Sequence, residues 1–272
     1  MLIRRRKIKK LSDDIRRIID GQYIDLRDNN ESVFSALKND IHTLAYHKKE
    51  QFDALQRDQH VMMDMLANIS HQLKTPLTSM TIMADLLDDA PLEKRTEFSH
   101  HIKAGLARMD WLVSSLLKMA KLDAGAIVFA AEQIPACELI NMALEPLQVL
   151  LEVKNQQVSI SADTKITCDI RWTAEALTNV LKNASEYSPE GGEIHVVSGE
   201  NPICAWVSVT DSGLGMNSTQ MAGLFKRFEG SRSEQGYGIG LPLALAIMRE
   251  QNGDVEVANE NTGAMFTLKV YR

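Results

Sequence analysis

The sequence predicts an α+β protein, in which a long helical part is followed by an α/β sandwich. Three observations point to this fold class. Apolar residues recur at three- and four-residue spacing early in the chain, two long amphipathic stretches follow, and after Ala124-Gly125 short strand patterns alternate with helices. We divide the chain into a linker at residues 1–58, a helical domain at 59–125 and a sandwich domain at 126–272.

The linker begins with a basic cluster although the whole chain has a formal net charge of −6. The cluster consists of Arg4, Arg5, Arg6, Lys7, Lys9 and Lys10. No stretch approaches the ~20 apolar residues of a membrane-spanning helix. We interpret the cluster as the inner flank of a membrane anchor upstream of residue 1, since positive residues stay on the cytoplasmic side. A solvated basic tail is the alternative, and the acidic balance argues against a general nucleic-acid binder.

A coiled-coil seam follows the basic cluster. Its residues are Phe34, Leu37, Ile41, Leu44, Leu55, Met62, Met65 and Ile69. Lys48, Gln51 and Asp58 occupy seam positions between them and weaken the pattern. The sequence therefore predicts a dimeric coiled-coil stalk with a soft middle, which an imperfect coiled coil would also explain.

The helical domain is predicted to be a hairpin. One helix runs from about Gln59 to Asp89 and stops near Ala90-Pro91, and a second runs from about Leu92 to Leu122. Pro76 lies inside the first helix, where it removes a backbone hydrogen bond and favours a bend. Because two antiparallel helices cannot bury broad apolar stripes alone, we expect two chains to pair as a four-helix bundle.

The sandwich domain combines short strands with amphipathic helices. Strands are expected at 158–160, 166–170, 194–197, 206–210, 254–258 and 265–270, and helices at 134–151, 173–187 and 241–251. Many strands are neighbours in sequence, which favours an α/β sandwich over a doubly wound sheet. Cys137, Cys168 and Cys204 lack metal-ligand spacing and are interpreted as reduced thiols in apolar positions.

The segment Ser70–Pro76 places a histidine among polar residues on the first helix of the hairpin. The neutral imidazole of His71 has a free lone pair near pH 7 and can attack phosphorus without prior deprotonation. We therefore expect His71 to be the nucleophile. The six other histidines are interpreted as solvated surface residues.

A second set of motifs lies in the sandwich domain. Glu175, Asn179 and Asn183 are one helical turn apart and share a face, where an amide oxygen is a hard ligand suited to Mg. Asp211 ends a strand and precedes Gly213 and Gly215. Three more glycines, Gly236, Gly238 and Gly240, open a helix at Leu241, where backbone N–H groups favour phosphate. Between the glycine motifs lies a short lid with Leu224–Phe228.

The order and spacing of these motifs resemble the sensor histidine kinases of bacterial two-component systems. Their histidine, asparagine, first-glycine, phenylalanine and second-glycine boxes occur here in sequence, from about Met62 to Arg272. The resemblance implies that residues 59–125 form the dimerisation and histidine phosphotransfer domain. It further implies that residues 126–272 form a catalytic ATP-binding domain of the gyrase, chaperone, kinase and mismatch-repair superfamily.

By this resemblance the chain is a homodimeric, ATP- and Mg-dependent protein-histidine kinase. It would autophosphorylate His71, pass the phosphoryl group to an aspartate of a response regulator, and also dephosphorylate that regulator, with Thr75 orienting water. The full-length protein would lie at the inner face of the cell membrane. Asn183 would be the Mg ligand, Asp211 would bind the adenine amino group, and Arg227 or Arg232 would meet the γ-phosphate. The nucleotide site would comprise Asn179, Lys182, Asn183, Tyr187, Asp211, Gly213, Gly215, Phe225, Arg227, Gly236, Gly238, Gly240 and Leu241.

Three positions refine this expectation. Asn179 stands where ATP-hydrolysing relatives carry a glutamate, and an amide cannot take a proton from water, which favours transfer over hydrolysis. Gln72 and Glu186 depart from the acidic and basic residues usual at their positions, and Lys182 could compensate for Glu186. These departures motivate an alternative, a catalytically weak dimeric adaptor or phosphatase-dominant pseudokinase that binds ATP.

Overall fold

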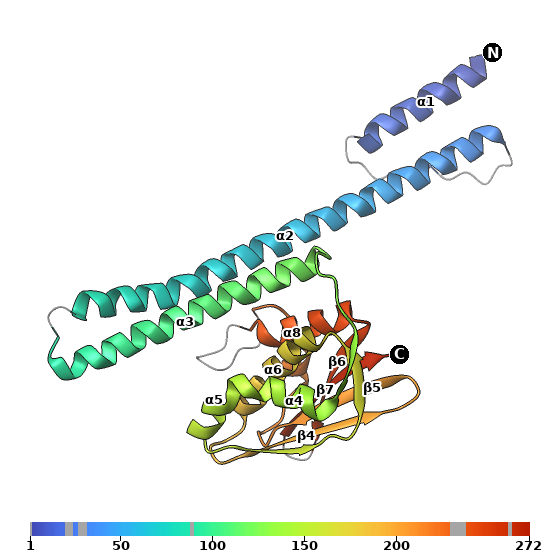
Figure 1. Cartoon of the computed structure of the whole chain (residues 1–272). Helices are drawn as coiled ribbons and strands as arrows, with labels where there is room; N and C mark the ends of the chain where they lie inside the picture. The colour runs from blue at the N-terminus through green and yellow to red at the C-terminus, as the bar shows by residue number, and fades with distance from the viewer. Residues whose placement is uncertain (1, 20–23, 27–31, 88–89, 229–237, 261–262) are drawn as a thin grey trace. The chain divides into compact units, whose positions relative to one another are not determined.

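The computed structural model describes residues 2–19, 24–26, 32–87, 90–228, 238–260 and 263–272 (Figure 1). The chain divides into two compact units, Met1–Ala67 and Asn68–Arg272. Over these described ranges, no helix combines the length and the apolar character that crossing a membrane requires.

The first unit contains a helix that the sequence analysis did not anticipate. Helix α1, Leu2–Ile19, includes the basic cluster and lies beside the first part of α2, Val33–Leu87 (Figure 1). Leu11 and Leu26 are buried, so this unit has a small apolar core of its own. The imidazole Nε2 of His42 lies 3.2 Å from a carboxylate oxygen of Asp25.

The predicted stalk and the predicted first helix of the hairpin are one continuous helix. Helix α2 has 55 residues and continues through Pro76, so the expected start near Gln59 was wrong. Seam spacing and hairpin spacing are both helical, and nothing between them breaks the helix. Helix α3, Leu92–Asp123, follows Pro91 as predicted.

Helix α3 ends at Asp123, just before the Ala124-Gly125 pair after which the sequence changes to strand patterns. Gly125 has a φ of +58°, a left-handed conformation that glycine adopts without strain. The Gly125 N–H donates to the carbonyl of Leu122 at 2.9 Å, and the Ala126 N–H donates to that of Lys121 at 3.0 Å. These two bonds form a Schellman motif, which satisfies the last carbonyls of the helix.

The sandwich domain is built on two sheets. Strands β1, Glu132–Pro135, and β3, Lys165–Cys168, form an antiparallel pair. The larger sheet has the order β2-β4-β5-β7-β6, in which β2 runs parallel to β4 and the other neighbours are antiparallel. Its strands are β2 Gln157–Ser161, β4 Glu193–Glu200, β5 Cys204–Thr210, β6 Gly253–Glu260 and β7 Gly263–Tyr271.

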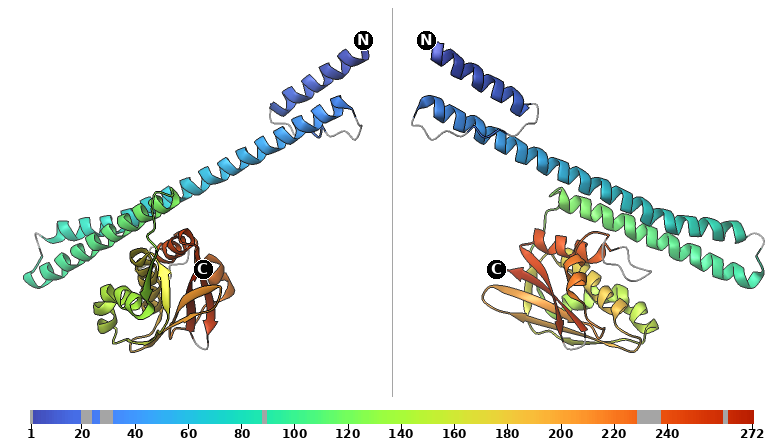
Figure 2. Two further views of the ribbon diagram at one scale, coloured as in Figure 1. Left: turned by 45° about the vertical axis from the view of Figure 1, so that its right-hand side comes forward. Right: turned by 180° about the vertical axis from the view of Figure 1, so that it is seen from behind.

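Helices cover one face of the larger sheet (Figure 2). They are α4 Ala136–Leu144, η1 Glu145–Leu147, α5 Gln148–Val153, α6 Ile170–Tyr187, α7 Ser218–Gly223 and α8 Gly240–Glu250. Side chains of α4, α6 and α8 share one core with the inward residues of β4, β5 and β7. A helical hairpin followed by an α/β domain confirms the predicted fold class.

Two predicted elements were wrong in their bounds. Ile134 begins no helix but lies in β1, because the residue before Pro135 is pushed away from helical conformation, and Pro146 falls in the short helix η1 that separates α4 from α5. The strand expected at 166–170 ends at Cys168. The side chain of Asp169 accepts a hydrogen bond from the Trp172 N–H at 3.1 Å and so caps α6.

The three cysteines are free thiols, as predicted. Cys168 and Cys204 are buried, whereas Cys137 is half-buried. Burial raises the pKa of the Cys168 thiol, so this group stays protonated and behaves as a small apolar side chain.

The core of the sandwich domain gives a stability prediction with a matched control. Leu243 of α8 is fully buried, whereas Leu214 is fully exposed. Leu243→Ala should lower the free energy of unfolding by about 2–5 kcal/mol, and Leu214→Ala by less than about 0.5 kcal/mol. Urea unfolding followed by tryptophan fluorescence measures both. Equal losses from the two variants would contradict the described core.

Candidate functional site

The sandwich domain contains a cavity of about 240 Å³ where α6, the end of β5 and the start of β7 meet. It is lined by Asn183, Tyr187, Asp211, Gly213, Leu214, Gly215, Met216, Gln220, Leu224 and Ala264. Five of these residues were expected in a nucleotide site, and they come from two motifs that are far apart in the sequence. The fold therefore brings the asparagine motif and the first glycine motif together.

Asp211 is the fixed point of this cavity. It directly follows β5, is buried, and its Oδ1 accepts hydrogen bonds from the N–H of Gly213 at 2.9 Å and of Ala264 at 3.0 Å. Its own N–H donates to the carbonyl of Ala264 at 3.0 Å. Both side-chain bonds seen in the described residues fall on Oδ1, so Oδ2 is left to accept a hydrogen bond from a ligand.

The turn after Asp211 requires glycine at two positions. A Cβ at Gly213 would lie 2.8 Å from the carbonyl oxygen of Tyr187, a separation that real Cβ atoms essentially never show. Gly215 has a φ of +68°. The backbone of this turn therefore forms the wall of the cavity itself, where a bound group can approach it closely.

The side chains of Glu175, Asn179 and Asn183 share one face of α6 but do not all lie in the cavity. Asn183 is half-buried and lines the cavity. Asn179 is buried outside the cavity, where its Nδ2 donates to the Glu175 carbonyl at 2.9 Å. Its Oδ1 lies against Gly240, where a Cβ would come within 2.9 Å. Asn179 therefore fixes the start of α8 against α6.

The amide of Asn183 fits a Mg ion that is carried by phosphate. An amide oxygen is a suitable hard ligand, and Mg usually takes few protein ligands when substrate phosphates supply others. In the described residues no group of three or more His, Cys, Asp or Glu side chains could hold a metal alone. A site at Asn183 thus depends on oxygens from the bound nucleotide.

The second glycine motif begins α8. Gly238 has a φ of +65°, and its carbonyl accepts a hydrogen bond from the Phe228 N–H at 2.9 Å. Phe225 and Phe228 pack against the core, and Leu241 is buried in it. Gly236 and Arg232 lie outside the described residues, so only Gly238, Gly240 and Leu241 of this motif are placed.

The C-terminal half of α3 packs directly onto the sandwich domain. Leu112, Met119 and Leu122 are almost fully buried and belong to the same core as α6 and α8. The ammonium of Lys118 lies 2.7 Å from a carboxylate oxygen of Glu175. Apolar packing therefore holds α3 against α8, and an ion pair joins it to α6.

Two predicted nucleotide ligands are engaged by α3 instead of lining the cavity. The Lys182 ammonium lies 4.8 Å from the ring centroid of Trp111 and 3.9 Å from the Glu186 carboxylate. The Arg227 guanidinium makes a two-point ion pair with Asp123, with N–O distances of 2.7 and 2.8 Å. In this arrangement both cations are used to bind α3.

His71 lies on α2, apart from the cavity lining, with an exposed side chain. Met80, nine residues along, is buried, and a Cβ at Gly105 of α3 would meet its side chain. Nine residues of α-helix are about two and a half turns, so His71 faces away from α3. Gln72 is half-buried, and the Thr75 hydroxyl donates to the His71 carbonyl at 3.2 Å.

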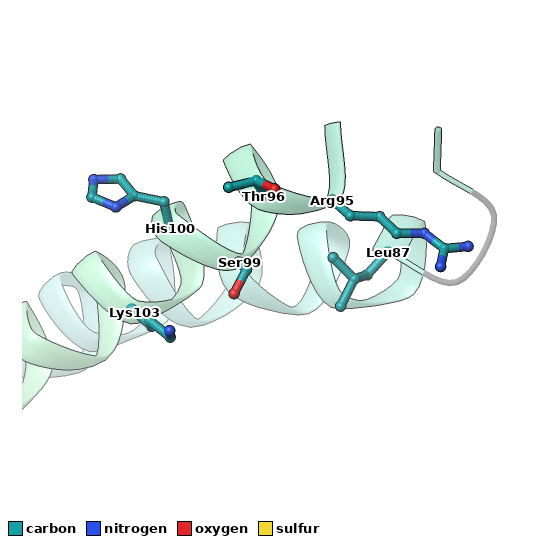
Figure 3. Close-up of a pocket in the computed structure, with 6 residues that line it drawn as sticks. All are labelled: Leu87, Arg95, Thr96, Ser99, His100 and Lys103. Atoms are coloured by element: carbon teal, nitrogen blue, oxygen red, sulfur yellow. The ribbon is translucent and has the colours of Figure 1, made fainter. Parts of the chain in front are cut away.

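A second hollow lies near the turn of the hairpin, with a volume of about 540 Å³ (Figure 3). It is lined by Leu87, Arg95, Thr96, Ser99, His100 and Lys103. His100 is an exposed imidazole on α3. Figure 3 shows its side chain pointing away from that of Arg95. It is a matched comparison for His71, because exposure alone would favour both imidazoles equally.

Sequence reasoning missed half of the cavity lining. Leu214 lies inside the first glycine motif, Met216 and Gln220 follow that motif, and Leu224 begins the predicted lid, so their place in or beside these motifs was a signal that could have found them. Ala264 carries no such signal. It joins the site because β7 pairs with β5, which local sequence cannot indicate.

Two family models match the chain. The model described as histidine kinase-, DNA gyrase B-, and HSP90-like ATPase matches residues 168–272, and the His Kinase A (phospho-acceptor) domain matches residues 61–125. The heme sensor protein HssS of Staphylococcus saprophyticus is 26% identical over 96% of this chain. The signal transduction histidine-protein kinase BaeS of Escherichia coli is 24% identical over 92% of it. The chain spans 56% of the length of each relative.

Solved structures share the fold. Histidine kinase AdeS of Acinetobacter baumannii has a TM-score of 0.61 and 19% identity, covering 74% of this chain and 97% of that one. Histidine kinase ThkA, solved in complex with the response regulator TrrA, has a TM-score of 0.66 and 19% identity, covering 82% and 66%. ShkA, solved in complex with AMPPNP, has a TM-score of 0.57 and 25% identity, covering 76% and 46%.

Proposed function

The chain belongs to the sensor histidine kinases of two-component systems, and we propose that it transfers the γ-phosphoryl group of ATP to His71 and then to an aspartate of a response regulator. The observation that carries this proposal is the cavity that joins Asn183 and Asp211 within the region matched by the ATPase model. The region matched by the phospho-acceptor model supplies an exposed imidazole at His71. We assign residues 59–125 the acceptor role and residues 126–272 the nucleotide-binding role.

We assign the nucleotide contacts from the cavity lining. Oδ2 of Asp211 accepts a hydrogen bond from the adenine amino group, and the turn through Gly213 and Gly215 lies along the nucleotide. The amide oxygen of Asn183 holds Mg at the phosphates. When bound, Mg neutralises phosphate charge and so favours attack at the γ-phosphorus.

At the acceptor, an imidazole nitrogen of His71 forms a bond to the γ-phosphorus while the bond from that phosphorus to the β,γ-bridging oxygen breaks and ADP leaves. The proton on the other ring nitrogen is lost afterwards. The side-chain oxygen of Gln72 can accept a hydrogen bond from that N–H and hold the tautomer, in place of an acidic residue. We assign Thr75 to the orientation of water during dephosphorylation of the regulator.

The observed arrangement is a docked one. Trp111, Lys118 and Asp123 of α3 hold the sandwich domain, whereas His71 on α2 faces away from α3. We infer that the nucleotide-binding domain must leave α3 before it can deliver phosphate. Arg227 becomes available to the γ-phosphate only once it separates from Asp123.

We propose that two chains pair through the hairpin. Leu66 and Leu77 of α2, with Leu106, Val113 and Leu117 of α3, are large apolar side chains that remain exposed in one chain. Apolar rows of this kind on a helical hairpin are buried when a second hairpin completes a four-helix bundle.

The proposed place at the inner face of a membrane rests on the basic residues 4–10 alone.

The acceptor assignment is tested by substitution. His71→Ala should abolish the acid-labile, base-stable phosphoprotein that forms with labelled ATP, because no other imidazole is proposed as acceptor. The affinity for ATP should stay within about twofold, since the cavity contains no α2 residue. His100→Ala is the matched control and should label normally. Wild-type label on His71→Ala would refute the assignment, and an unlabelled wild type would favour the adaptor alternative.

Asp211→Asn tests the adenine contact without removing the turn. The asparagine Oδ1 can still accept the N–H groups of Gly213 and Ala264, but an NH2 group then faces the adenine amino group. A hydrogen bond to a charged group is worth roughly 1.5–3 kcal/mol, so the Kd for ATP should rise about tenfold to a hundredfold. Calorimetry measures this change, with an unaltered melting temperature as the control. Unchanged affinity would remove Asp211 from the adenine site.

Substitutions of Asp123 and of Arg227, which form an ion pair, should change the rate of autophosphorylation in opposite directions. Asp123→Asn frees the guanidinium and weakens docking, so autophosphorylation should become about two- to fivefold faster. The gain is small because both side chains are more than a third exposed. Arg227→Ala loosens docking as well but removes a phosphate contact, so this variant should be slower than wild type. If both variants were slowed equally, the pair would be a structural support for the active state instead.

A further inference from the structure

Asn259 of β6 makes a two-point contact with the wall of the nucleotide cavity. Its Nδ2 donates to the carbonyl of Met216 at 2.7 Å, and its Oδ1 accepts from the N–H of the same residue at 2.9 Å. A carboxamide is the one side-chain group that offers a donor and an acceptor side by side without charge. Both backbone polar groups of Met216, a cavity residue, are therefore fixed by one side chain.

The side-chain amide of Asn259 also restricts which residue can stand at position 215, directly before Met216. A Cβ at Gly215 would lie 3.0 Å from Oδ1 of Asn259, which is tighter than nearly all real Cβ contacts. Gly215 also has a left-handed φ of +68°. Asn259 thus contacts the glycine turn without lining the cavity itself.

The contact extends to both neighbouring walls. Asn259 is paired in register with Ala264, whose N–H donates to Oδ1 of Asp211. On the other side, Met216 precedes Asn217, which caps α7 through reciprocal bonds with Gln220 at 2.8 and 2.9 Å. Gln220 lines the cavity. One asparagine therefore connects the Asp211 wall with the α7 wall.

We propose that Asn259 is a positioning residue for ATP, which holds the turn from Gly213 to Met216 in its binding conformation. This role rests on the proposed nucleotide function and adds a residue that none of the glycine, asparagine or phenylalanine motifs contains. Among the described residues, the side chain of Asn259 contacts the cavity wall at Met216 and Gly215. Its loss should therefore weaken nucleotide binding and leave the transfer step itself unchanged.

The chain offers a matched control. Oδ1 of Asn201 accepts hydrogen bonds from the N–H groups of Ile203 and Cys204, both at 2.8 Å, in the turn between β4 and β5. That turn contributes nothing to the cavity lining. Asn201→Ala and Asn259→Ala each remove two bonds from an asparagine to backbone, and they differ in whether the backbone belongs to the cavity.

The experiment measures ATP affinity by calorimetry, KM and kcat of autophosphorylation, and melting temperature. Asn259→Ala should raise Kd and KM about fivefold or more and leave kcat within about twofold, whereas Asn201→Ala should change neither constant. Asn259→Asp keeps the acceptor for the Met216 N–H but opposes a carboxylate to the Met216 carbonyl, so it should also raise KM. If Asn259→Ala does not fold, the same constants are measured on the isosteric variant Asn259→Asp.

Unchanged affinity in a folded Asn259 variant, or an equal loss in Asn201→Ala, would overturn the positioning role. A fall in kcat at unchanged KM would overturn it as well. A wild-type chain that does not bind ATP would overturn the proposed function and, with it, this role. If the wild-type chain binds ATP normally, a negative result with the Asn259 variants therefore counts against the positioning role alone.

Discussion

The carboxylate of Asp211 is the constraint on which the site depends. Its Oδ1 ties the end of β5 to the Gly213 turn and to the start of β7, in addition to the hydrogen bonds by which β5 and β7 pair. Among the described residues both donors lie on Oδ1, so Oδ2 is left to accept a hydrogen bond from a ligand. This explains why the cavity needs a sheet in which β7 pairs with β5, and why its wall needs glycine at 213 and 215. In the proposed function, recognition of adenine and closure of the fold therefore use the same carboxylate.

The two helices of the hairpin, α2 and α3, have different surroundings. The first presents His71 to solvent, and the second buries Leu112, Met119 and Leu122 in the nucleotide-binding domain. In the proposed function the acceptor His71 and the docking surface lie on different helices of one hairpin, so the domain leaves α3 before it reaches the acceptor. The ion pairs at Lys118 and Arg227 are individually weak, as expected of partly exposed charges. Burial of the three apolar side chains therefore contributes more to the docked state than these ion pairs do.

The parts of this structure that sequence could predict are those that depend on local pattern. The bounds of α3 follow from Pro91 and from the Ala124-Gly125 pair, whereas the joint position of Asn183 with Asp211 was implied by the resemblance to sensor histidine kinases. Tertiary contacts decided the rest. Lys182 and Arg227 were expected at phosphate, but the docking of α3 offers Trp111 and Asp123 as nearer partners. Ala264 and Asn259 enter the site through strand pairing, which leaves no local signal.

In the proposed function, ATP bound in the cavity transfers its γ-phosphoryl group to one exposed imidazole, that of His71 on α2. The most direct test is to incubate the wild-type chain with ATP and Mg, digest it under alkaline conditions that preserve phosphohistidine, and locate the phosphoryl group by tandem mass spectrometry. The account predicts modification at His71 and an unmodified His100, although both imidazoles are exposed. A phosphoryl group on His100, or on a residue of the sandwich domain, with His71 unmodified, would contradict it.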